Sequence, residues 1–195
     1  MRAEMTINSP LGPITIGEEN GAIVSLRIER GDKKPANTRA GREKDAACDA
    51  GQNEAVSLDK TPRAIEEAPT PLLATAAAQL DAYFYCGLKN FDLPLAPEGS
   101  DFEHAIWNLM NAIPFGETRS YGELARAATA AAKAQGLDAA TVAQAVGQAC
   151  RRNPIAIIQP CHRVLASGGK VGGFSAPGGA ETKLALLRHE GSVLL

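Results

Sequence analysis

The chain has 195 residues, of which 45% are hydrophobic and 22% are charged, and its formal net charge is −2 at pH 7. This balance is typical of a folded globular protein with one or two small domains and excludes a fibrous or disordered chain. The small negative charge argues against a protein that coats nucleic acid by bulk electrostatics. No apolar stretch reaches the roughly 20 residues that cross a bilayer, and no signal peptide is visible. We therefore expect a cytoplasmic protein that does not contact a membrane.

The cysteines decide which chemistry the sequence supports. Four are present: Cys48, Cys86, Cys150 and Cys161. None belongs to a CxxC pair, and the histidines offer no zinc-finger spacing, so we expect neither a metal site nor a cofactor. In a reducing compartment the thiols stay free. The question is then whether one of them is reactive.

Residues 1–98 are predicted to form a small α/β domain. The first 30 residues alternate apolar and polar side chains, and Asn20-Gly21 is typical of a β-hairpin turn. Residues 31–70 have no aromatic side chain and scatter Pro, Gly and charges, which predicts a flexible surface insertion.

An amphipathic helix is predicted next, because apolar residues from Leu72 to Phe84 recur at helical spacing. The segment 91–95 is predicted to be extended. The Pro- and Gly-containing linker 96–100 places the domain boundary after residue 98.

Residues 99–195 are predicted to form a mainly helical domain. Its first helix carries an apolar face from Phe102 to Ile113. Ser120 and Glu123 then form the pattern of a capping box, which predicts a helix from about residue 121 to about residue 135.

A further helix is predicted after Gly136, with Asp138 as its N-cap and Cys150 near its end. Helix, glycine turn, helix fits both a helix-turn-helix and an ordinary αα-hairpin. Gly147 inside this helix costs about 1 kcal/mol relative to Ala. We therefore expect something narrow to approach it, either a packed neighbour or a DNA minor groove. The helix surface is small or uncharged throughout: Ala143, Gln144, Gly147 and Gln148.

The candidate chemistry lies at Cys161-His162, after an apolar run between two prolines. A thiolate is a strong nucleophile, and a nearby imidazole can take its proton. Adjacent residues rarely face the same way, so a bridging water or a backbone bend is expected. Glu190 or a carbonyl would then orient His162. The alternative is a buried structural cysteine beside a surface histidine.

A glycine-rich loop at 167–179 follows the dipeptide, but it lacks the GK[ST] of a phosphate loop. Its glycines let backbone N–H groups approach a ligand, and Phe174 could stack on a ring. A last helix is predicted from about Glu181 to Glu190, with Gly191 as its stop.

Because these motifs follow one another in this order and at this spacing, residues 101–195 resemble the O6-alkylguanine-DNA alkyltransferases, or methylated-DNA–protein-cysteine methyltransferases. The N-terminal part matches more loosely, through SPLG at 9–12 and FDLP at 91–94. The resemblance implies an α+β protein: a small ribonuclease-H-like domain followed by a winged-helix-like helix-turn-helix domain. The matching motifs are IPFGET at 113–118, SYGELA at 120–125, AVG at 145–147, NP at 153–154, PCHRV at 160–164, GGFS at 172–175, Lys183, and EG at 190–191.

The resemblance also implies direct-reversal DNA repair. Cys161 would accept an alkyl group from O6 of guanine, once per protein molecule and irreversibly. His162 would deprotonate Cys161 through a water, with Glu190 polarising His162 and Asn153 holding the adjacent turn. The target atom is inaccessible in a stacked duplex, so the nucleotide must be flipped out.

For DNA binding, the resemblance implies a monomer that meets double-stranded DNA in the minor groove. Tyr121 would contact the guanine ring and crowd the phosphate, the carbonyls of Cys161 and Val164 would read the exocyclic amine, and Ser175 would donate toward O6. Phe174 would wall the pocket. The helix surface that meets the groove is formed by Ala143, Gln144, Gly147 and Arg151.

The sequence departs from the family pattern at several places. Gln144 stands where the family usually has an arginine that fills the gap left by the flipped base, a role that Arg151 or Arg152 could share. The helix-turn-helix has extra residues between 127 and 138, residues 31–70 exceed the usual connection, and Gln159 stands where an aliphatic residue is commoner.

Two other functions remain open from the sequence. Relatives without the acceptor cysteine only bind lesions and flag them for other repair. A cysteine hydrolase could use Cys161, His162 and Glu190, and it would show turnover without DNA.

Overall fold

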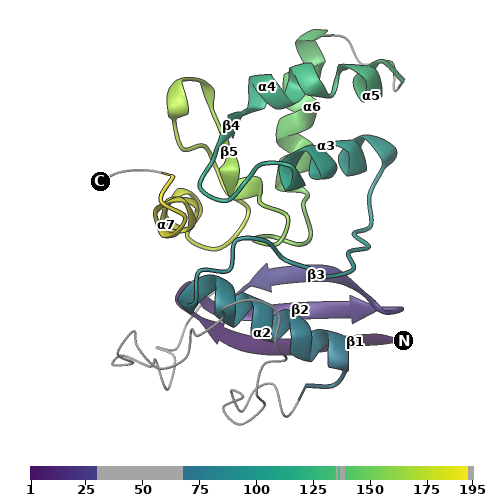
Figure 1. Ribbon diagram of the computed structural model, residues 1–195. Helices are drawn as coiled ribbons and strands as arrows, with labels where there is room; N and C mark the ends of the chain where they lie inside the picture. Colours follow the sequence, from purple (N-terminus) through teal and green to yellow (C-terminus); the bar gives the residue numbers. More distant parts are fainter. Residues whose placement is uncertain (30–67, 135, 137–138, 193–195) are drawn as a thin grey trace.

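The computed structural model describes residues 1–29, 68–134, 136 and 139–192 (Figure 1). The predicted insertion at 31–70 lies almost entirely outside the described residues. The predicted N-cap Asp138 and the thiol of Cys48 also lie outside them. None of the described helices is both long and apolar enough to span a membrane.

The N-terminal domain is a three-stranded antiparallel sheet in the order β1 (Arg2–Ser9), β2 (Gly12–Glu19) and β3 (Ala22–Ile28). The predicted hairpin turn is confirmed, because Asn20 and Gly21 both have left-handed φ values, of 52° and 78°. Asn and Gly are the residues that adopt this conformation at low cost.

One face of the sheet is covered by α2 (Pro71–Tyr85), the predicted amphipathic helix (Figure 1). Thr70 caps it by accepting a hydrogen bond from the Leu73 N–H, and Pro71 occupies the first turn, where its missing N–H costs nothing. The buried face of the helix ends at Tyr83, which is fully buried. The buried residues of α2 are Leu73, Ala76, Ala77, Leu80 and Tyr83.

The C-terminal domain is mainly helical. Its helices are α3 (Asp101–Asn111), α4 (Tyr121–Ala127), α5 (Thr129–Ala134), α6 (Ala139–Arg151) and α7 (Ala180–His189). The predicted capping box of Ser120 and Glu123 is present at the start of α4. A second capping box, of Ser100 and Glu103, begins α3. Helices α4 and α6 both pack on α3, around the buried Trp107.

The prediction of one helix from about residue 121 to about residue 135 is wrong in one respect. The helix breaks at Ala128, and a separate helix, α5, follows. Ala128 has φ −84° and ψ 5°, outside the helical range. The hydroxyl of Thr129 donates to the Arg126 carbonyl at 2.7 Å. Such side-chain bonds compete with the helical ladder, and Thr is a weak helix former.

The two domains meet along β3 (Figure 1). The N–H of Leu26 donates to the carbonyl of Pro154 in the C-terminal domain at 2.8 Å, while the N–H of Ile23 donates to the carbonyl of Pro94 within the N-terminal domain at 2.8 Å. The side chains of Ile155 and Ile157 are buried in the N-terminal core. The chain just before Cys161 is therefore fixed to the sheet of the other domain.

Short elements complete the site. A 3₁₀ turn η2 (Cys161–Arg163) leads into β5 (Val164–Leu165), which pairs in parallel with β4 (Arg119–Ser120). A second 3₁₀ turn, η3 (Ser167–Gly169), lies in the glycine-rich loop. Because β4 precedes Tyr121 directly, this pairing brings Tyr121 beside Cys161.

Candidate active site

A tight loop presents Cys161. The Asn153 side chain closes it: its amide donates to the Gln159 carbonyl at 2.8 Å, and its oxygen accepts from the Ile155 N–H at 3.1 Å. Ile157, within the loop, is fully buried and has a φ of 72°. A β-branched residue in the left-handed region is strained by about 1–3 kcal/mol, and such strain persists only where packing imposes it.

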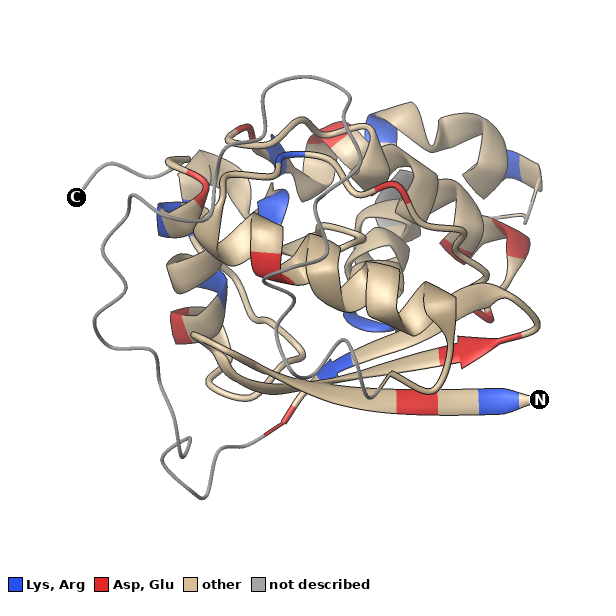
Figure 2. Cartoon of the chain, turned by 60° about the horizontal axis from the view of Figure 1, so that its bottom comes forward, with Lys and Arg blue, Asp and Glu red and all other residues tan. Residues whose placement is uncertain are grey.

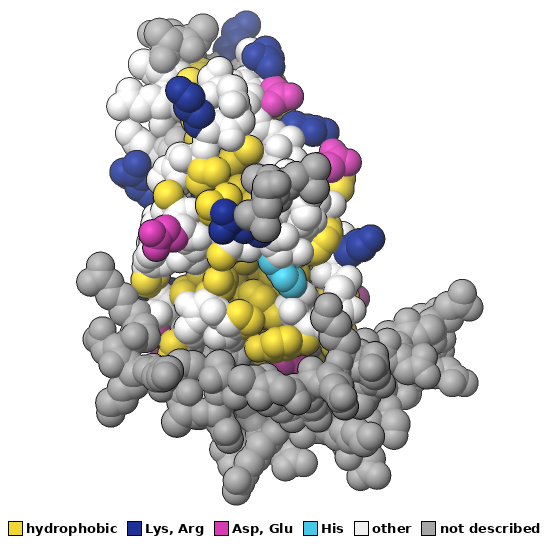
Figure 3. Space-filling view, turned by 90° about the vertical axis from the view of Figure 1, so that its left-hand side faces the viewer, with side chains coloured by type: hydrophobic (Ala, Val, Ile, Leu, Met, Phe, Trp, Pro, Cys, Tyr) yellow, Lys and Arg dark blue, Asp and Glu magenta, His cyan; other side chains and the backbone are white. Residues whose placement is uncertain are grey.

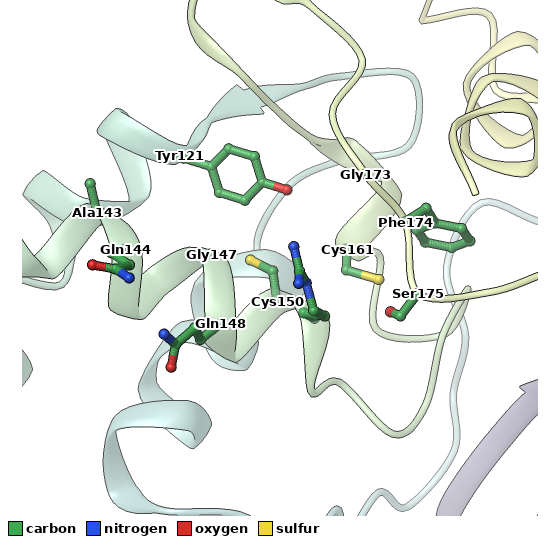
Figure 4. A pocket seen from close by; sticks show the side chains of 11 residues that line it. Tyr121, Ala143, Gln144, Gly147, Gln148, Cys150, Cys161, Gly173, Phe174 and Ser175 are labelled. Carbon is green, nitrogen blue, oxygen red and sulfur yellow. The ribbon is translucent and has the colours of Figure 1, made fainter.

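The 3₁₀ turn at Cys161–Arg163 sends the neighbouring side chains of Cys161 and His162 in different directions. Cys161 lines a pocket and its Sγ points toward the loop that carries Phe174 and Ser175 (Figure 4). His162 is fully buried, and its Nε2 lies 2.8 Å from Oε1 of Glu190. Of the two predicted orienting partners for His162, the structure provides the carboxylate.

Among the described residues, Glu190 receives hydrogen bonds from His162 and from three others. The Tyr83 hydroxyl donates to Oε1 at 2.8 Å, and the guanidinium of Arg163 donates to both oxygens, at 3.0 and 2.8 Å. The N–H of Gly116 adds a long contact of 3.4 Å to Oε2. The carboxylate is thus paired with Arg163 as well as with His162.

These donors determine the charge state of the carboxylate and the tautomer of the imidazole. Burial alone would raise the pKa of Glu190, but the hydrogen bonds from His162 and Arg163 outweigh it and lower the pKa to about 2. An ionised carboxylate only accepts, so Nε2 of His162 carries a proton. Burial lowers the pKa of His162, so the ring is neutral at pH 7 and its Nδ1 holds a free lone pair. Nδ1 is buried and has no hydrogen-bond partner among the described residues.

The thiol itself is buried, with 4% of Cys161 exposed. Burial raises the pKa of the Cys161 thiol, and the Asn153 side chain, the Lys183 ammonium and backbone N–H groups only partly oppose this. Cys161 is therefore protonated at rest, and a base is needed to make it nucleophilic. A neutral imidazole with a vacant Nδ1 in the next residue is suited to that task.

The pocket in front of Cys161 has a volume of about 690 Å³. Figure 4 shows the Tyr121 hydroxyl pointing into it from α4, with α6 along the opposite side. Burial raises the pKa of Tyr121 to about 12, so its hydroxyl remains a hydrogen-bond donor at neutral pH. The lining residues are Tyr121, Ala143, Gln144, Gly147, Gln148, Cys150, Arg151, Cys161, Gly173, Phe174 and Ser175.

The position of Gly147 distinguishes the two explanations given for it. A Cβ built at Gly147 would meet no atom of the described residues within 4 Å, so none of these residues packs there in a way that requires a glycine. The residue instead faces the open pocket. A ligand that approaches α6 closely is the remaining explanation.

The charges around the pocket differ in their availability. Arg152 is held by Glu103 at 3.1 Å, whereas Arg151 lines the pocket. Lys and Arg side chains lie over the upper, helical part of the face in Figure 3, while both signs are interspersed along the chain in Figure 2. Arg151 is therefore the cation among the residues that line the pocket, and the uncharged Gln144 lines it about two turns earlier on α6.

The structure thus brings the predicted site residues together in two groups. Asn153, His162 and Glu190 lie behind the thiol. The residues predicted to bind DNA line the pocket, except Val164, whose carbonyl accepts a hydrogen bond from the Lys183 ammonium. The Cys161 carbonyl likewise accepts from the Val164 N–H. Each carbonyl oxygen has a second lone pair, although Val164 is fully buried.

Sequence reasoning gave no role to Tyr83, Arg163, Lys183 or the pocket residue Cys150. Tyr83 and Lys183 belong to the inward faces of their helices. Helical periodicity shows that such side chains are buried, but it does not show whether the hydroxyl or ammonium at the end reaches a functional site or only packs in the core. Among the described residues, no group of three or more His, Cys, Asp or Glu side chains could hold a metal ion.

A buried thiol lies next to a neutral imidazole that is hydrogen-bonded to an ionised carboxylate, and a helix of small residues borders the pocket in front of it. This arrangement defines a protein with an activatable cysteine nucleophile that faces an open pocket. Comparison with known proteins gives the family. Residues 101–192 match the model of the "6-O-methylguanine DNA methyltransferase, DNA binding domain", and residues 3–97 match that of its "ribonuclease-like domain". The chain belongs to the O6-methylguanine-DNA methyltransferase family.

Individual relatives agree with this assignment. The chain is 35% identical over 188 residues to the methylated-DNA–protein-cysteine methyltransferase of Mycobacterium tuberculosis H37Rv, covering 96% of this chain and 91% of the relative. It is 46% identical over 117 residues to that of Methanosarcina acetivorans, covering 60% of this chain and 68% of the relative. The crystal structure of the M. tuberculosis O6-methylguanine methyltransferase aligns with a TM-score of 0.66 at 34% identity, covering 100% of this chain and 96% of that one. The M. tuberculosis protein in complex with DNA aligns with a TM-score of 0.63 at 35% identity, covering 97% and 92%.

Proposed function

We propose that this protein repairs DNA by direct reversal, with Cys161 taking an alkyl group from O6 of guanine in a single, irreversible transfer. The observation that carries the proposal is the pairing of a buried, base-backed thiol with an open α6 surface at Gly147. A cysteine hydrolase needs the first feature but has no use for the second. The relatives' names and the DNA complex of one of them support the same activity.

The transfer uses the proton acceptor already identified. A water bridging Sγ of Cys161 and Nδ1 of His162 carries the thiol proton to the imidazole, while Glu190 stabilises the resulting charge. The thiolate attacks the alkyl carbon, so that an S–C bond forms as the C–O6 bond breaks. The electron pair of the broken bond passes to the guanine, and protonation of the base completes its restoration. The thioether product is stable, so each molecule reacts once.

Recognition requires the nucleotide to leave the duplex. A minor groove about 6 Å wide admits a helix only where its surface is small, which suits Ala143 and Gly147. We expect the Tyr121 hydroxyl to donate to the guanine ring, Ser175 to donate toward O6, and Phe174 to wall the base. The second lone pairs of the Cys161 and Val164 carbonyls would accept from the exocyclic amine.

Filling the gap left by the flipped base falls to Gln144, helped by the cation Arg151. Both line the pocket, whereas Arg152 is paired with Glu103. Gln can donate and accept hydrogen bonds but brings no charge to the phosphates. We expect the protein to act as a cytoplasmic monomer on double-stranded DNA that carries O6-alkylguanine, with its domain boundary after residue 98.

The test is the intact mass of the protein after mixing with a duplex that contains one O6-methylguanine. The expected result is a gain of one methyl group per chain, mapped by peptide analysis to Cys161 and lost in Cys161→Ala. Cys86→Ala, at a half-buried cysteine on the far domain, is the matched control and should still gain the methyl group. Binding of the lesion duplex without any gain in mass would instead indicate a protein that flags lesions. If the protein neither binds the lesion duplex nor gains mass, a cysteine hydrolase is the function that remains.

A further inference from the structure

Lys183 on α7 is a buried cation without an anionic partner. Its side chain is fully buried and is among the largest such side chains in the molecule. No carboxylate lies within ion-pair distance of it among the described residues, whereas Arg163, the residue before its partner Val164, is paired with Glu190. Burying an unpaired ammonium is costly, so a compensating contact is expected.

Two contacts fix the position of the ammonium. It donates a hydrogen bond to the Val164 carbonyl, and it lies 5.7 Å from the centre of the Tyr121 ring. Val164 in turn donates its N–H to the Cys161 carbonyl. Lys183 is therefore tied through one hydrogen-bonded turn to the backbone of the nucleophile, and it lies beside the Tyr121 ring that lines the same pocket.

The groups that can become negative near this ammonium are few. From η2 it meets Cys161, from α6 Cys150 and from α4 Tyr121. Burial raises the pKa of Tyr121 and of Cys150, each to about 12, so both stay neutral at physiological pH. Cys161 is the group that loses its proton in the reaction.

A buried thiolate needs a positive charge close to it. The buried cation Arg163 is already paired with Glu190, and Glu190 contacts the imidazole rather than the thiol. Proton transfer from Cys161 to His162 thus creates a thiolate in a buried pocket. The imidazolium formed at His162 remains paired with Glu190. Lys183 is a further cation that acts on Cys161, and it has no carboxylate partner among the described residues.

We propose that Lys183 is a positioning residue for the nucleophile: its buried ammonium stabilises the thiolate of Cys161 and holds the Val164 turn that carries it. His162 removes the proton, and Lys183 stabilises the resulting negative charge on the sulfur. The inference builds on Cys161 as the acceptor in the proposed function, but its test needs neither DNA nor a lesion.

The experiment measures the rate at which iodoacetamide alkylates Cys161, by peptide mapping, as a function of pH. Lys183→Met keeps the length and removes the charge, Lys183→Arg keeps the charge, and Lys170→Met, at an exposed loop lysine, is the control. In Lys183→Met the midpoint of the profile should rise by about one pH unit or more, which lowers the rate at neutral pH about tenfold. Lys183→Arg should recover most of the loss, and Lys170→Met should match the parent protein.

A purely structural lysine would not move that midpoint, so a folded Lys183→Met protein with an unchanged profile overturns the proposal. A second measurement covers a variant that fails to fold. Because coupling between two sites is reciprocal, removing the thiolate must lower the pKa of Lys183. NMR titration of ¹³Cε-labelled lysine in the parent protein and in Cys161→Ser should show this decrease. Identical titrations would overturn the proposal even if methyl transfer to Cys161 is established.

Discussion

Replacing Gly147 by Ala should stabilise the protein and at the same time weaken its binding to DNA. Gly147 lies inside α6, and in the part of the chain that the structure describes the added Cβ would meet no atom within 4 Å. The full difference in helix propensity, about 0.8–1 kcal/mol, should therefore appear as added stability. In a domain pair of this size that corresponds to a rise in Tm of about 2–4 °C.

The same methyl group projects into the pocket side of α6, where the proposed minor groove must approach. Forcing one methyl group into a close-packed contact costs about 1–3 kcal/mol, which corresponds to a Kd about 5- to 150-fold weaker. Thermal unfolding gives the first quantity, and fluorescence anisotropy with a duplex at fixed salt gives the second.

Ala143→Gly is the matched control, because Ala143 is an exposed α6 residue that lines the same pocket. It should lose about 1 kcal/mol of stability without a steric loss of DNA affinity. If Gly147→Ala binds duplex as tightly as the parent protein, α6 does not enter a groove, and the argument from Gly147 is refuted.

Three other substitutions test separate parts of the site. Gln144→Arg adds a charge to the lining of the pocket, so transfer from a lesion duplex should speed up and the salt dependence of binding should steepen by about one phosphate contact; an unchanged rate would show that another residue fills the gap. Gln159→Leu should raise the unfolding free energy by about 1–3 kcal/mol, because the buried Oε1 has no partner among the described residues, and a loss of stability in urea would reveal a hidden partner. Glu190→Gln should cost about 3–5 kcal/mol, because it leaves Arg163 buried without its carboxylate. Since the pKa of Glu190 is lowered to about 2, its stabilisation is complete above its ordinary pKa near 4.5 and is lost as the pH falls toward 2; Glu190→Gln should lack that acid-dependent loss in a pH series of unfolding curves.

The elements set by local interactions could be predicted from the sequence. The Asn20-Gly21 turn and the Ser120–Glu123 capping box each depend on residues within a few positions of one another. The path of α4 beyond Ala127 could not, because the Thr129 hydroxyl competes with the helix by a bond that sequence periodicity does not reveal. The strained φ of Ile157 is likewise imposed by packing against a distant sheet.

Within the site, the pairing of Cys161 with His162 and Glu190 was accessible from the motifs, but the charge balance was not. Tyr83 and Glu190 are separated by 107 positions, and Lys183 and Val164 by 19, yet each pair shares a hydrogen bond. The buried ammonium and the buried phenol both look like ordinary inward residues of amphipathic helices. Only the three-dimensional structure shows which buried polar groups face one another.

The contact between Tyr83 and Glu190 has a consequence for how the two domains cooperate. Tyr83 belongs to α2 of the N-terminal domain, and its hydroxyl shares Oε1 of Glu190 with the imidazole of His162. The His189 ring, next to Glu190, bonds the Tyr83 carbonyl through Nε2 at 2.8 Å. On the other side of the site, Ile155 and Ile157 anchor the Cys161 loop in the N-terminal core. Both the base and the nucleophile are therefore positioned by the domain that carries no reacting atom. A separated C-terminal domain would keep every residue of the Cys–His–Glu set but would lose a donor to its carboxylate and the packing that strains its loop.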